Sequence, residues 1–205
     1  MSGKHTYRFG AITVILAGFA FSASASEGQP AAFMATVGNA SQPIGHYEFC
    51  QGHRAECAVK SKTEKRVHLT PARWNALVAV NDAVNAAVTP ATDEEVFGKA
   101  EVWSYPTDKG DCEDFVLLKR RELIAQGWPV GALLITVVRQ SNGDGHAVLT
   151  VLSDRGDLVL DNLQSQIEVW SETDYQFVKR QSEFNSGRWV SIEDARTATV
   201  GSLQR

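Results

Sequence analysis

Three residues of the types that perform nucleophilic catalysis follow one another along the chain: Cys112, His146 and Asp161. A cysteine thiolate is a nucleophile, an imidazole can take and return its proton, and a carboxylate can hold the imidazole in one orientation. The order therefore predicts a Cys–His–Asp catalytic triad. Taken one at a time, these residues also fit ordinary roles: a small buried thiol, a hydrogen-bonding histidine and a turn-forming aspartate.

The elements predicted before residue 127 are helical. A threonine–proline pair at 70–71 supplies a hydroxyl cap and a first-turn proline, and a second such pair at 89–90 ends that helix. Residues 111–126 contain no proline or glycine and Gly127 follows them, which predicts a second helix. Its apolar residues cover much of its circumference, so we expect it to be central and buried. Cys112 lies at its start, where unpaired backbone N–H groups and the helix dipole favour a thiolate.

After residue 127 the pattern changes to short β-type runs. These runs are apolar and β-branched, and the segments between them are rich in turn-forming residues. The predicted strands cover residues 132–138, 146–152, 158–161 and 175–179, with turns at 141–145 and 154–157. His146 then begins the second strand and Asp161 ends the third, and hairpin pairing can bring such ends side by side. Helices followed by hairpins predict an α+β domain in which an antiparallel sheet packs on the Cys112 helix.

The N-terminus has the features of a secretory signal. Lys4 and Arg8 precede an apolar run at 9–21, and small residues at 23–25 offer a cleavage site. The run is shorter than the roughly 20 apolar residues of a spanning helix. We therefore expect a cleaved signal at 1–25 and an exported protein with no stable membrane insertion, rather than a membrane anchor.

The rest of the chain is predicted to comprise an N-terminal segment at 26–69 and a single domain at 70–205. Residues 26–42 are small and polar, and we expect them to be poorly ordered. The formal net charge is −4 and no long basic run occurs, which argues against nucleic acid as a partner.

The three cysteines have different expected roles. Cys50 and Cys57 lie close together in a polar segment, and an oxidising compartment would let them pair. That pairing leaves Cys112 as the free thiol, whereas either alternative would tie Cys112 to a distant residue. We therefore predict a Cys50–Cys57 disulfide.

Three motifs occur in the order nucleophile, base and orienting acid. They are GDCEDF at 110–115, GHAVL at 145–149 and LVLDNL at 158–163. Together they resemble the motifs of the bacterial transglutaminase-like cysteine peptidases, a family that includes the LapG-type periplasmic proteases that trim surface adhesins. The resemblance implies a papain-like, transglutaminase-type fold, Cys–His–Asp hydrolysis and a periplasmic location. It also implies a large surface or secreted protein as substrate, such as an adhesin, and an inner-membrane receptor as regulatory partner.

The carboxylates around the predicted nucleophile pose an electrostatic problem. Asp111, Glu113 and Asp114 surround Cys112, and like charges disfavour a thiolate. In one interpretation Asp111 caps the helix and the others complement its dipole. In the other, carboxylate oxygens bind Ca²⁺, whose charge reverses the local effect. The family resemblance supports calcium, with Asp111 and Glu113 at the matching positions.

Residues 93–105 are predicted to be a mixed connection anchored by Phe97 and Trp103. An oxyanion formed during catalysis needs N–H donors, and the Cys112 backbone N–H is one candidate. The indole N–H of Trp103 is a second candidate, and the alternative for Trp103 is a core aromatic.

The sequence leaves the acceptor in the reaction open. Water makes the protein a cysteine peptidase, whereas an amine acceptor makes it a transglutaminase and a peptidoglycan amide substrate makes it an amidase. A third hypothesis is a non-enzymatic, calcium-responsive binding module in which Cys112 is inert.

Overall fold

The computed structural model describes residue 1 and residues 31–63 and 66–197. Apart from Met1, the predicted signal at 1–25 lies outside the described residues. Within the described ranges, no helix has both the length and the apolar character needed to cross a membrane.

A seven-stranded antiparallel sheet forms the centre of the fold, in the strand order β1-β9-β8-β4-β5-β6-β7. Its strands are β1 (Ala35–Ala40), β4 (Leu133–Arg139), β5 (Gly145–Ser153), β6 (Gly156–Leu160), β7 (Glu168–Val169), β8 (Gln176–Ser182) and β9 (Asn185–Glu193). The predicted strands at 132–138, 146–152, 158–161 and 175–179 correspond to β4, β5, β6 and β8. The antiparallel sheet of the sequence prediction is therefore confirmed.

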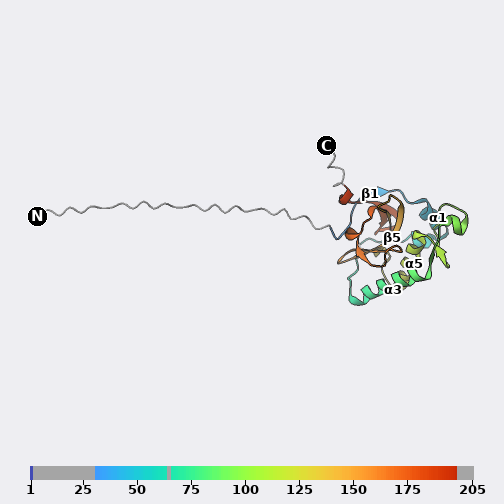
Figure 1. Cartoon of the computed structure of the whole chain (residues 1–205), viewed down its shortest axis with the longest axis horizontal. Coiled ribbons are helices and arrows are strands. Elements are labelled where there is room, and N and C mark those ends of the chain that lie inside the picture. Colours follow the sequence, from blue (N-terminus) through green and yellow to red (C-terminus); the bar gives the residue numbers. More distant parts are fainter. Residues whose placement is uncertain (2–30, 64–65, 198–205) are drawn as a thin grey trace, which may run out of the picture.

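Helices cover one face of this sheet. The two longest are α3 (Pro71–Ala87) and α5 (Cys112–Ala125), and Figure 1 shows α3, α5 and β5 in successive layers. The shorter helices are α1 (Ile44–Gly52), α2 (Arg54–Cys57) and α4 (Asp93–Phe97), with 3₁₀ turns at Val130–Ala132, Trp170–Glu172 and Ala195–Thr197. Both long helices begin where the sequence predicts. Thr70 caps α3 by accepting a hydrogen bond from the Arg73 N–H.

Two apolar clusters lie on the sheet. Along β5, Ala147, Leu149 and Val151 belong to the larger cluster, which includes Phe115 of α5, whereas Val148 belongs to the smaller one. This alternation follows from the opposite directions of successive side chains in a strand. Burial on both faces fixes the register of β5. It therefore also fixes the position of His146, the second residue of this strand.

A small parallel pair of strands sets the approach to Cys112. It joins β2 (Thr89–Pro90), after α3, to β3 (Lys109–Gly110), before α5. Gly110 lies close to Asp114, because an added Cβ at this glycine would be 2.6 Å from Asp114 Oδ2. The chain can therefore turn into α5 at this point only with a residue that lacks a side chain.

Two expectations for the irregular segments are wrong. Residues 35–40 form β1, although residues 26–42 were expected to be poorly ordered; β1 is an edge strand whose order comes from pairing with β9. Phe97 is not an anchor, since its side chain is 43% exposed at the end of α4, whereas Trp103 is 7% exposed and lies in the core.

Candidate active site

Cys112 is the first residue of α5, as the sequence predicts, and it is the free cysteine of the described chain. Helix α5 packs on β5, and the backbone N–H of Ala147 lies near enough to the sulfur to favour a thiolate by hydrogen bonding. The residue before Ala147 is His146, so the fold brings the predicted nucleophile against the strand that carries the predicted base.

His146 and Asp161 form a buried pair. His146 Nε2 lies 2.8 Å from Asp161 Oδ1, and both side chains are almost fully enclosed. Hairpin pairing of β5 with β6 brings them together, as expected for a strand start and a strand end. Because Nε2 is engaged by Asp161, Nδ1 is the ring nitrogen left to exchange a proton.

Two further groups hold Asp161. The Tyr175 hydroxyl donates to Oδ2 at 2.5 Å, and the Leu163 N–H donates to Oδ1 at 3.0 Å. Burial raises the pKa of Asp161, but hydrogen bonds from His146, Tyr175 and Leu163 outweigh burial and leave the pKa below its usual value. Asp161 is therefore ionised at neutral pH. Tyr175 was not predicted as a site residue, because nothing in the sequence pairs it with Asp161.

The thiol of Cys112 points its proton at a carboxylate. Its Sγ lies 3.1 Å from Glu113 Oε2, and the described residues include no hydrogen bond between Cys112 and His146. Burial, together with the negative charge and hydrogen bond of Glu113, raises the pKa of Cys112 far above its usual range. In this arrangement Cys112 is a neutral thiol.

Three carboxylates converge beside Cys112. One oxygen each from Asp93, Asp111 and Glu113 lies within 4.8 Å of the other two. Burial, and then the charge of Asp93, raises the pKa of Asp111 to about 6. Burial, and then the charge of Asp111, raises the pKa of Glu113 to about 8. Asp111 and Glu113 therefore have no neighbouring positive charge strong enough to keep their pKa values in the usual range.

The donor set of this acidic cluster fits a calcium ion. Asp93 Oδ1 and Asp111 Oδ1 are buried without a hydrogen-bond partner, and none of the cluster's three carboxylates forms a salt bridge in the described part of the chain. Calcium takes several carboxylate oxygens in flexible geometry. Helix capping explains Asp111 less well, since its side chain makes no capping hydrogen bond to α5. Asp93 was missed because α4 and α5 are far apart in sequence and only the fold joins them.

The family model described as bacterial transglutaminase-like cysteine proteinase matches residues 36–197. The chain belongs to this family of proteinases. Among solved structures, Legionella pneumophila LapG (calcium-bound) is similar at 25% identity and TM-score 0.50, over 80% of this chain and 87% of that one. Legionella pneumophila LapG (EGTA-treated) is 28% identical over 63% of this chain and 75% of that one, with a TM-score of 0.49. The search of curated proteins found no match.

The third acid of the proteinase motif, Asp114, is directed elsewhere. It is fully buried and accepts a hydrogen bond from the Ser104 N–H at 2.7 Å. Burial is the main reason that its pKa rises to about 7. Asp114 therefore anchors the segment before α5, whereas Asp111 and Glu113 face the acidic cluster.

The indole N–H of Trp103, the second predicted oxyanion donor, has a partner in the structure. Its indole N–H donates to Glu101 at 2.7 Å, and its ring packs edge-on against those of His46 and Trp189. The core-aromatic alternative is therefore favoured, because the one donor of the side chain already has a partner. The Cys112 backbone N–H, in the first turn of α5, is left as the predicted donor.

Proposed function

We propose that this chain is an exported, calcium-dependent cysteine protease with Cys112, His146 and Asp161 as its triad. The observation that supports the proposal best is the buried hydrogen bond between His146 and Asp161. His146 lies on β5, and the helix that begins with Cys112 packs against this strand. Membership of the proteinase family gives the reaction class.

In the proposed reaction, His146 Nδ1 takes the proton of Cys112, and the thiolate attacks a peptide carbonyl carbon. The oxyanion forms near the Cys112 backbone N–H. His146 then gives its proton to the leaving amine, which departs and leaves a thioester. A water deprotonated by His146 hydrolyses the thioester, and the proton returns to the Cys112 sulfur. Asp161 keeps the imidazole oriented and stabilises its cationic form throughout.

Asp93, Asp111 and Glu113 would hold the calcium ion, as the convergence of the three carboxylates and the orphaned buried oxygens of Asp93 and Asp111 indicate. When bound, the ion supplies positive charge beside the nucleophile. A Glu113 carboxylate engaged in this way is a weaker acceptor for the Cys112 thiol, which favours transfer of the proton to His146. The similarity to LapG (calcium-bound) supports this assignment.

The proposed substrate is a large secreted or surface protein such as an adhesin, cleaved in the periplasm after removal of the signal at 1–25. An inner-membrane receptor that sequesters the protease is the proposed regulator. Both follow from the family resemblance of the sequence motifs. The other proposed segments are 26–69 and the peptidase domain at 70–205.

The test is labelling of the mature protein by an electrophilic cysteine probe, in calcium and in excess chelator. We expect calcium-dependent labelling at Cys112 that is lost in Cys112→Ala and greatly reduced in His146→Ala. A comparison of surface proteins from cells with and without Cys112→Ala then identifies the substrate. A labelled amine and a glutamine peptide detect transamidation. An alkylation rate like that of an ordinary thiol in both calcium and chelator would favour the binding-module hypothesis and contradict the proposal.

A further inference from the structure

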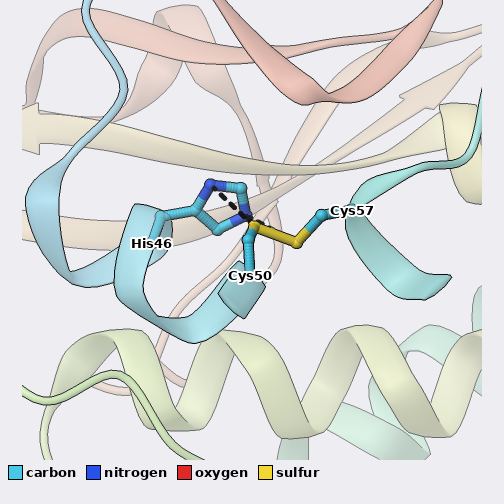
Figure 2. Close-up of side chains that lie close together, drawn as sticks. All are labelled: His46, Cys50 and Cys57. Carbon is cyan, nitrogen blue, oxygen red and sulfur yellow. Dashed lines mark hydrogen bonds between the residues drawn. A yellow bond between two sulfur atoms is a disulfide. The ribbon is translucent and has the colours of Figure 1, made fainter. Parts of the chain in front are cut away.

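The predicted disulfide is present, and a buried histidine packs against it. Cys50 at the end of α1 is bonded to Cys57 at the end of α2. His46 lies one helical turn before Cys50 and is 1% exposed. Figure 2 shows its ring against the disulfide, with Nε2 3.7 Å from Cys50 Sγ and 4.0 Å from Cys57 Sγ. No step of the proposed hydrolysis uses these three residues.

The hydrogen bonds of His46 fix the position of its proton. Trp189 Nε1 lies 3.2 Å from His46 Nδ1, and an indole N–H can only donate, so Nδ1 is an acceptor. Burial, and then the charge of Arg120, lowers the pKa of His46 to about 4, so the ring is neutral at neutral pH. Its single proton is therefore on Nε2, the nitrogen nearest to the Cys50 sulfur.

Donors outnumber acceptors around this disulfide. Gln42 Nε2 lies 2.7 Å from His46 Nδ1 and 3.6 Å from Cys50 Sγ. The Gln181 amide is oriented by the Ile135 N–H, which donates to Oε1, so its Nε2 donates to the Ser186 carbonyl at 2.8 Å and faces His46 Nε2 at 3.2 Å. A neutral imidazole accepts one hydrogen bond, and a disulfide sulfur is a weak acceptor. A thiolate at Cys50 would supply a strong acceptor for the N–H groups of Gln42 and His46, which lie beside its sulfur.

We propose that Cys50–Cys57 is a redox-active disulfide that exchanges with dithiols, with Cys50 as the leaving thiolate. A dithiol thiolate attacks Cys57 Sγ, forms a mixed disulfide with it and releases Cys50 as a thiolate held by the N–H groups of Gln42 and His46. The second thiol of the dithiol, as its thiolate, attacks the mixed disulfide and releases Cys57. The dithiol is thereby oxidised to a disulfide, and the two electrons reduce Cys50 and Cys57. A stabilised leaving thiolate shifts such an equilibrium toward the reduced form.

The experiment uses the full mature chain carrying Cys112→Ala, so that neither the proposed nucleophile nor its activity contributes. The oxidised protein is equilibrated at pH 7 in mixtures of reduced and oxidised dithiothreitol. Free thiols are then alkylated and mapped by mass, while circular dichroism reports the fold. We expect reduction within the folded state, and at pH 6 we expect faster alkylation of Cys50 than of Cys57.

Gln42→Met removes the nearest side-chain N–H donor at almost constant volume. We expect it to shift the exchange equilibrium toward the disulfide by roughly ten- to a hundredfold, since one charge-assisted hydrogen bond is lost. Gln51→Met is the matched control, because Gln51 lies on α1, the helix that carries Cys50, but is exposed and bonds the Tyr47 carbonyl instead. Reduction that occurs only on unfolding, or equal equilibria for the two variants, would overturn the proposal.

Discussion

Lys119 is a fully buried lysine. It lies on α5 two helical turns after Cys112, and its Nζ has no hydrogen-bond partner in the described part of the chain. Burial lowers its pKa to about 7, although the charges of Asp161 and Asp82 oppose this change. Lys119→Met keeps an unbranched chain of similar length and removes the charge. It therefore isolates the effect of burying an ammonium group without a partner.

The sign follows from proton binding in the two states. The folded pKa is about 7, and an unfolded lysine titrates near 10.5. Between these values the unfolded chain binds more protons, so the free energy of unfolding rises with pH. At about 1.36 kcal/mol per pKa unit, the lysine term gains roughly 2–3 kcal/mol from pH 6 to pH 9. We expect Lys119→Met to be more stable than the parent at pH 6, with an advantage that shrinks by this amount at pH 9.

The assay is urea unfolding of both proteins at four pH values between 6 and 9, with the disulfide intact. The difference between the two proteins removes the titration of groups they share. The exposed Lys99 provides the control, and Lys99→Met reports the effect of removing a lysine charge at the surface. A pH-independent difference for Lys119→Met, or a variant less stable than the parent at pH 6, would show that the ammonium has effective partners and would refute the reasoning.

Four further outcomes are expected. Cys112→Ala and His146→Ala each abolish hydrolysis by the folded protein, and Asp161→Asn retains traces; normal turnover by either alanine variant contradicts the triad. Calcium affinity rises from pH 6 to pH 8, by up to about tenfold per pH unit for each proton released. The cause is that Asp111 and Glu113, with pKa values raised to about 6 and about 8, must lose protons when calcium binds. Calorimetry in two buffers measures that proton release. Tyr175→Phe moves the acid limb of the activity profile upward by about one pH unit, since Asp161 loses a hydrogen bond to its ionised form; an unmoved limb assigns Tyr175 to packing alone. Gly45→Ala lowers stability by about 1–3 kcal/mol in thermal unfolding, because its Cβ would lie 2.2 Å from Trp103 Cδ1, whereas Gly52→Ala on the same helix meets nothing within 4 Å and should not destabilise.

Local signals predicted the parts of the fold that local physics determines. The Thr70 cap and the uninterrupted run before Gly127 located the two long helices, and turn-forming residues located the β4–β5 and β5–β6 hairpins. Strand β1 carries no such signal. Its side chains are mostly exposed and its order depends on β9, about 150 residues later in the chain, so no local pattern could reveal it.

The same distinction applies to the site. The roles of Cys112, His146 and Asp161 could be predicted because each lies in a motif whose residue type indicates nucleophile, base or orienting acid. Asp93 and Tyr175 are ordinary in sequence and become site residues only because α4 reaches the start of α5 and the end of β6 reaches the segment before β8. The role of Trp103 was also undetermined, since an indole N–H can face either a substrate or, as here, Glu101.

Under the proposed function, the thiol proton of Cys112 has two possible acceptors, His146 of the triad and Glu113 of the acidic cluster. The Cys112 thiol donates a hydrogen bond to Glu113 Oε2, and Glu113 is also one of the three carboxylates of that cluster. A carboxylate that coordinates a cation has its negative charge offset by that cation and is a weaker acceptor for a neighbouring thiol. Occupation of the cluster would therefore weaken the competitor of His146 and, at the same time, add positive charge that favours a thiolate. Calcium dependence then requires no rearrangement of the fold, because the change lies in one side chain adjacent to the nucleophile.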